Sequence, residues 1–130
     1  AAPITAASTV NAYSQPVLRI SKSLAPTTVS ENGQLTYTFI IQNYGNVPAT
    51  ATDALVVTDR FDPVLDPIAV SFDGTAWASG TEYTYNNTTG QFTSTTGAIT
   101  VPAATYTQDA TTGAISIVPG SATLTITGTV

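Results

Sequence analysis

Residues 121–130 read Ser121-Ala122-Thr123-Leu124-Thr125-Ile126-Thr127-Gly128-Thr129-Val130, and polar side chains alternate with apolar ones along most of this stretch. A period of two is typical of a β-strand with one buried face. The threonines then share one face of the strand, while Leu124, Ile126 and Val130 share the other. No later strand follows in this sequence, so we expect the domain to lack a closing strand of its own.

The composition favours the same structural class. Hydrophobic residues make up 42% of the 130-residue chain, which is enough for one domain with a real core, whereas charged residues make up only 8%. The chain is rich in threonine, valine and isoleucine, which suit a pleated, half-buried surface. We therefore predict a folded all-β domain with an unusually uncharged surface.

Several classes of function are disfavoured by the residues that the chain lacks. It contains neither histidine nor cysteine, and we find no nucleophile–base pair and no singled-out pair of carboxylates, so we predict no enzyme, no metal site and no cofactor. Its net charge is −5, which argues against binding to nucleic acid or to an anionic membrane surface. No apolar run is long enough to span a bilayer, so we expect no membrane insertion.

Turn signals break the chain into short alternating runs. We expect strands over residues 17–24, 34–43, 53–59, 68–72 and 82–85, in addition to the last ten residues. Three Thr-Thr-Gly units end at Gly90, Gly97 and Gly113, and we interpret them as turns in which glycine supplies a positive φ. No helical period lasts beyond about two turns. The pattern predicts an immunoglobulin-like β-sandwich of roughly eight to ten strands.

The first sixteen residues form an extension to the sandwich, which we place at residues 17–130. Residues 4–13 have the character of a separate strand, and the segment Ser14-Gln15-Pro16 separates them from the rest. An incomplete sandwich exposes a groove that an extended segment of a neighbour can fill. We therefore expect residues 4–13 to act as a donor strand. Its inward face would consist of Ile4, Ala6, Ser8, Val10 and Ala12. The predicted acceptor groove consists of Leu124, Ile126, Val130, Leu18 and Ile20.

The alternative is that residues 1–15 pair within their own domain or form a linker to another domain. The start Ala1-Ala2-Pro3 resembles the mature end that a signal peptidase leaves, which would suit a secreted protein.

Several stretches resemble a known repeat. They are Ile20–Val29, Asn32–Phe39, Gln42–Asn46 and Val56–Asp59, and the segment from Val101 to Gly120 is similar to a clostridial branch of the same family. The repeat is domain-of-unknown-function family eleven, which occurs in surface proteins of Gram-positive bacteria and some archaea. The resemblance covers about residues 17–130. It implies an immunoglobulin-like fold, an extracellular location and tandem repeats, each closed by a strand that Ile4–Val10 resembles.

Lys22 is the only lysine, and alternation places it on the same strand face as Leu18, Ile20 and Leu24. A buried lysine needs a partner. It is a candidate either for an isopeptide bond or for an ion pair. The candidate partners are Asp59, Asp53 and Asn43.

Three weaker candidates concern ligands and modification. Five aspartates between Asp53 and Asp73 are moderately clustered, but they lack the spacing of a calcium loop and suit surface turns. Residues 86–89 contain two overlapping Asn-x-Thr sequons, which also suit a turn. Trp77 with Tyr83 and Tyr85 is a candidate sugar platform, whereas a lone tryptophan in a sandwich is more often part of the core.

The leading hypothesis from sequence is a structural subunit of a secreted, extracellular fibre, a homopolymer that assembles head to tail by exchange of the donor strand. The first alternative is a monomeric adhesin or spacer module of a bacterial cell-surface protein, which displays loops to a host protein or glycan. The second alternative is a surface-layer lattice protein.

Overall fold

The computed structural model describes residues 15–130, so the predicted donor strand lies outside the described residues. These residues form an all-β structure, which confirms the predicted fold class. The strands are β1 (Leu18–Ala25), β2 (Gln34–Asn43), β3 (Thr58–Arg60), β4 (Ile68–Phe72), β5 (Thr75–Trp77), β6 (Tyr83–Asn86), β7 (Gln91–Ser94), β8 (Thr105–Gln108), β9 (Ile115–Val118) and β10 (Gly120–Thr129), with one short 3₁₀ turn, η1 (Ala51–Asp53).

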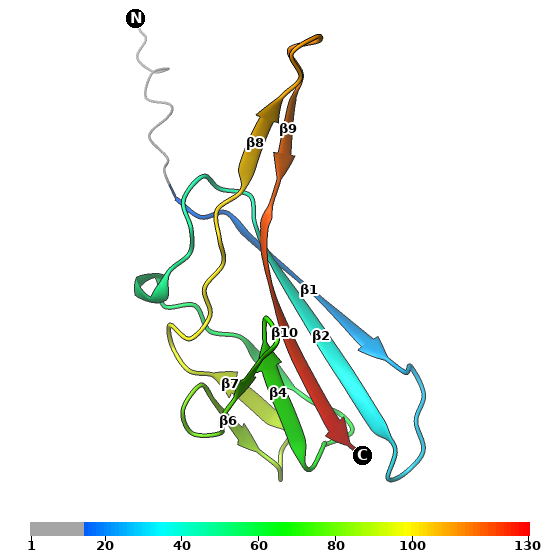
Figure 1. Ribbon diagram of the computed structural model, residues 1–130. Coiled ribbons are helices and arrows are strands. Elements are labelled where there is room, and N and C mark those ends of the chain that lie inside the picture. Colours follow the sequence, from blue (N-terminus) through cyan, green and yellow to red (C-terminus); the bar gives the residue numbers. More distant parts are fainter. Residues whose placement is uncertain (1–14) are drawn as a thin grey trace, which may run out of the picture.

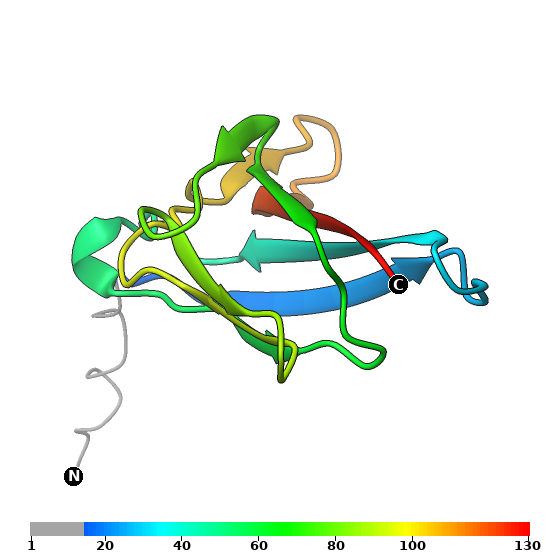
Figure 2. The same cartoon turned by 90° about the horizontal axis from the view of Figure 1, so that it is seen from below.

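Two antiparallel sheets of unequal size form the sandwich (Figures 1 and 2). The larger sheet has the order β1-β2-β10-β4-β5, and the smaller has the order β3-β7-β6. The strands β8 and β9 form a separate two-stranded ribbon that projects from one end of the body. The larger sheet therefore offers more inward-facing surface than the smaller sheet can cover.

The strand β10 lies in the middle of the larger sheet. It pairs with β2 along its whole length and with β4 from Leu124 to Gly128, so both of its edges are occupied over that part. The inward side chains of Leu124 and Ile126 are fully buried, while the intervening threonines are only partly buried. The predicted alternation of the last ten residues is confirmed, and it forms the centre of the core.

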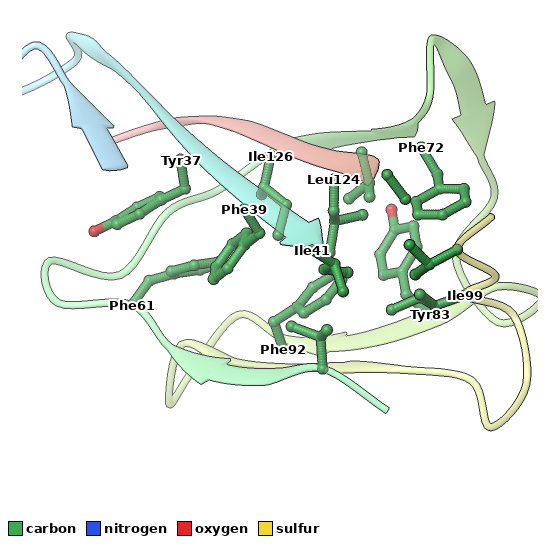
Figure 3. Close-up of a cluster of buried hydrophobic side chains, with 14 of the residues drawn as sticks. Tyr37, Phe39, Ile41, Phe61, Phe72, Tyr83, Phe92, Ile99, Leu124 and Ile126 are labelled. Carbon is green, nitrogen blue, oxygen red and sulfur yellow. The ribbon is translucent and has the colours of Figure 1, made fainter. Parts of the chain in front are cut away.

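Aromatic side chains from both layers fill the space between the sheets (Figure 3). The ring of Tyr37 on β2 stacks on Phe61 with 4.7 Å between centroids, and Tyr83 on β6 stacks on Phe92 of β7 at 5.4 Å. The Tyr85 hydroxyl donates to the carbonyl of Leu65 at 2.6 Å and accepts from its amide at 3.1 Å, which ties β6 to the segment before β4. Stacked pairs of this kind stabilise a core beyond the area that they bury.

The sequence predictions of strands succeed where one face is continuously buried. The strand at 34–43 has the predicted bounds, and 68–72 is also confirmed. The predicted strand over 53–59 is wrong in its first part, because the chain makes the turn η1 there and enters β3 only at Thr58. Asp53 accepts a hydrogen bond from the amide of Thr50 at 2.7 Å, and Ala54 has a φ of 56°, which ends the turn. Local capping by the aspartate competes with strand formation.

The three Thr-Thr-Gly units all form turns, as predicted. Their glycines, Gly90, Gly97 and Gly113, have φ values of 83°, 81° and 76°. A side chain at two of these positions would also meet a backbone carbonyl oxygen, that of Phe61 opposite Gly90 and that of Ala51 opposite Gly97. Glycine is therefore required there both by conformation and by space.

We predict that Leu124→Ala lowers the free energy of unfolding by about 3 kcal/mol, because it leaves a cavity at the centre of the core. The matched control is Thr125→Ala on the opposite face of the same strand, which should cost less than about 1 kcal/mol. Chemical denaturation followed by tryptophan fluorescence measures both. Equal losses for the two variants would contradict the position of β10 at the centre of the sheet.

Candidate functional site: an open edge of the sandwich

One side of the sandwich is open. The larger sheet ends at β1 and the smaller ends at β3, and among the described residues neither strand has a partner on its outer side. The two edges lie on the same side of the body, because Lys22 of β1 reaches Asp59 of β3 with 2.6 Å between Nζ and Oδ2. The gap between them is the candidate site, which we call the open groove.

The first part of the open groove is an apolar hollow of about 170 Å³. Leu18 and Ile20 of β1 form one wall, and the segment 55–57 before β3 forms the other. The full lining is Leu18, Arg19, Ile20, Ile41, Leu55, Val56, Val57 and Ile99. Ile20 remains 55% exposed and Val56 remains 43% exposed, although both lie beside the core. Large apolar side chains are thus left uncovered along a contiguous strip.

The second part of the groove continues along β1 as far as Lys22 and Asp59. It has a volume of about 360 Å³ and shares Ile20, Val56 and Val57 with the first hollow. The register explains why β1 faces inward here: Ile20 lies opposite Ile41, and Lys22 lies opposite Phe39. Both partners on β2 are core residues, so the predicted shared face of Leu18, Ile20, Lys22 and Leu24 is confirmed.

The backbone of β1 completes the groove. The amide of Tyr44 donates to the carbonyl of Val17 at 2.8 Å, which sets the phase of the pairing with β2. In an antiparallel pair the residues alternate between those that bond to the partner strand and those that point away from it. Leu18, Ile20, Lys22 and Leu24 therefore direct their amides and carbonyls outward. An added strand would bond to the same four residues whose side chains face the groove.

An ion pair bridges the groove. The ammonium of Lys22 also lies 4.9 Å from the ring centroid of Tyr37 and 5.9 Å from that of Phe39. Burial raises the pKa of the Tyr37 hydroxyl, and the charge of Lys22 partly opposes that rise, while Asp59 and Asp62 add to it. The aromatic faces attract the charged ammonium, so this setting favours an ion pair.

The geometry does not favour an isopeptide bond. An amine that attacks a carboxyl must be uncharged and shielded from water, whereas the Lys22 side chain is 43% exposed. Among the described residues, Asp59 is the one acid in ion-pair contact with Lys22.

The other two predicted partners of Lys22, Asn43 and Asp53, make hydrogen bonds elsewhere, so that part of the prediction is wrong. Asn43 is fully buried and accepts hydrogen bonds from the amides of Val17 and Gly45 at 3.0 and 2.9 Å, while its own amide donates to Val47 at 2.8 Å. It holds the start of β1 against the end of β2. Asp53 caps the exposed turn η1.

The predicted acceptor groove is correct for its residues on β1 and wrong for those on β10. Leu18 and Ile20 line the open groove, but Leu124 and Ile126 belong to the closed core. The prediction that the groove follows the last strand is wrong, because β2 and β4 occupy the two edges of β10. Val130 is half-buried, and its amide donates to the carbonyl of Gly33 at 2.8 Å. The donor residues Ile4, Ala6, Ser8, Val10 and Ala12 lie outside the described residues.

Sequence reasoning missed the wall formed by residues 55–57. The run Leu55-Val56-Val57 is predicted as part of a strand, whereas it lies outside the strands of the structure and lines the groove opposite β1. The carbonyls of Leu55 and Val57 accept hydrogen bonds from the amides of Gly97 and Ser94 on its other side. The candidate sugar platform is not formed, because Tyr83 is buried on Phe92, Tyr85 bonds Leu65, and Trp77 stacks on Phe72.

Within residues 15–130, no three acidic side chains gather as a metal site, and no helix is long and apolar enough to cross a membrane.

Comparisons with protein-family models, with curated proteins and with solved structures find no match, so the resemblance drawn from the sequence stays a prediction.

We predict that the intact protein has the mass of its sequence, with no loss of water or ammonia, because Lys22 and Asp59 form an ion pair. Lys22→Met and Asp59→Asn should each change the free energy of unfolding by less than about 1 kcal/mol, since the pair is partly exposed and screened. Mass spectrometry of the denatured chain and chemical denaturation measure the two effects. A mass lower by one water, restored in Lys22→Met after correction for the substitution, would show the crosslink instead.

Proposed function

We propose that this protein is a structural subunit of an extracellular fibre, in which residues 4–13 of one copy fill the open groove of the next. The observation that carries the proposal is the open groove itself: two edge strands face each other across uncovered apolar side chains. Unpaired edges of this kind promote pairing with another chain. Strand addition satisfies the backbone of β1 and covers Ile20 and Val56 in one step.

The donor pattern fits the shape of the groove. The apolar hollow of about 170 Å³ has room for one branched side chain, such as that of Val10 or Ile4. The Lys22–Asp59 pair crosses the groove next to this hollow. Ala6 and Ser8 supply small side chains that suit a donor passing over the pair. On the inward face of the donor, these two small side chains separate the two larger ones.

The path of the chain before β1 favours a neighbour over self-pairing. A side chain at position 45 would run into the carbonyl oxygen of Gln15 and the backbone of Pro16. The chain thus approaches β1 by passing the loop that follows β2, on the side away from the free edge of β1. Returning along that edge would require the chain to reverse its direction directly before Val17. Donation to another copy avoids this reversal.

A fibre made this way is open-ended. The donor segment and the groove are different surfaces, so each added copy presents a fresh groove or a fresh donor. The low charge of the chain leaves little long-range repulsion between copies. The extracellular location rests on the family resemblance and on the composition.

We predict that two single variants each block assembly and complement one another. Val10→Asp places a charge on the donor, and Ile20→Asp places one in the groove, where the native side chain is 55% exposed and lies outside the core cluster. Each variant alone should stay monomeric. A mixture should stop at a heterodimer, because the intact donor of one variant fits the intact groove of the other. Size-exclusion chromatography with light scattering measures all three states.

The control for the groove variant is Ser23→Asp, on the outer face of the same strand, which should assemble as the native chain does. Removal of residues 1–13 should likewise leave a folded monomer. Fibres of normal length from the deletion would overturn the donor-strand mechanism. A native chain that stays monomeric at high concentration would overturn the fibre and favour a monomeric surface module.

A further inference from the structure

The ribbon of β8 and β9, which we call the arm, projects from the body beside the start of the described chain (Figure 1). All eight of its strand residues are exposed. Among the described residues, one side-chain hydrogen bond joins the arm to the body: the Tyr106 hydroxyl donates to the carbonyl of Tyr44 at 3.1 Å. A lone two-stranded ribbon is marginally stable in water, so its persistence calls for further contacts.

The arm has an apolar face. The register places Tyr106 opposite Ile117 and Gln108 opposite Ile115, so these four residues share one face. Ile115 is 68% exposed and Ile117 is 50% exposed. The opposite face carries Thr105, Thr107, Ser116 and Val118. The arm contains one charged residue, Asp109.

The tip of the arm is well defined. The Asp109 carboxylate accepts hydrogen bonds from the amides of Thr111 and Thr112 at 2.7 and 3.0 Å, which also lowers the pKa of Asp109. Its carboxylate thus stabilises the turn, and this exposed charge lies at the tip, away from the strands of the arm. What the arm offers a partner is an apolar face and two free backbone edges, which suits another uncharged β surface.

The foot of the arm borders the point at which residues 4–13 join the body. Gln15, Val17, Tyr44, Gly45, Asn46 and Tyr106 line a hollow of about 540 Å³ there. Residues 13 and 15 can be at most about 7 Å apart. The four-residue strands of the arm extend about 13 Å from its foot. A neighbouring copy that binds residues 4–13 in its groove would therefore lie within reach of the arm.

We propose that the apolar face of the arm, formed by Tyr106, Ile115 and Ile117, is a second self-association surface that packs against the copy receiving residues 4–13. This inference rests on the proposed fibre. The donor strand fixes which copy is the neighbour, and the arm sets the angle between successive bodies and buries the residues that the ribbon leaves exposed.

The test compares two arm variants in the full chain. Ile115→Ser combined with Ile117→Ser should raise the critical concentration for assembly at least about tenfold, equivalent to about 1.4 kcal/mol of contact. The matched control, Val118→Ser, alters an equally apolar residue on the opposite face and should assemble normally. Sedimentation measures assembly. Thermal unfolding of the unassembled subunits should be unchanged, because the arm lies outside the core.

A crosslink identifies the partner directly. The chain has no cysteine, so Ala110→Cys at the tip accepts a single photoreactive maleimide. Illumination of fibres should join two chains, and the join should disappear when Val10→Asp also blocks assembly. Normal assembly of the double serine variant, or crosslinks only within one chain, would overturn the arm inference while leaving the donor-strand fibre intact. A native chain that never assembles would overturn both.

Discussion

The structure depends on the pairing of β10 between β2 and β4. This central strand closes the middle of the larger sheet and inserts Leu124 and Ile126 between the layers. With β2 and β4 as its neighbours, the larger sheet ends at β1 on one side and at β5 on the other. The smaller sheet, with three strands, ends at β3 on the same side as β1. The open groove follows because the larger sheet has five strands and the smaller sheet has three.

An open edge exposes a protein to unwanted pairing, and an inward-pointing charge is one way in which natural sheets limit it. Lys22 occupies that position on β1, and Asp59 compensates its charge from β3. The pair therefore holds the two edges together without filling the apolar hollow beside it. The same two residues thus protect the open edge and tie it to β3.

The parts of the fold that the sequence predicts well are those in which one face of a strand is continuously buried. The alternation in β2 and in β10 locates both strands and their inward faces, because burial imposes the period directly. The same alternation places Lys22 beside Ile20. It does not reveal that β10 is central, since the order of strands depends on contacts distant in sequence. The groove was therefore predicted beside the wrong strand.

Two other features escaped prediction because they include apolar side chains that stay exposed. Residues 55–57 have the composition of a strand, yet the capped turn at Asp53 precedes them and their carbonyls bond only to the amides of residues 94 and 97, so Val56 stays uncovered in the groove wall. The arm shows the alternation Ile115-Ser116-Ile117 beyond a Thr-Thr-Gly turn, which is a usable hairpin signal, but its apolar residues face solvent. In both places, apolar side chains of the kind found in a protein core stay uncovered among the described residues. The groove and the arm are the two such surfaces of this chain, and the proposed fibre would cover both.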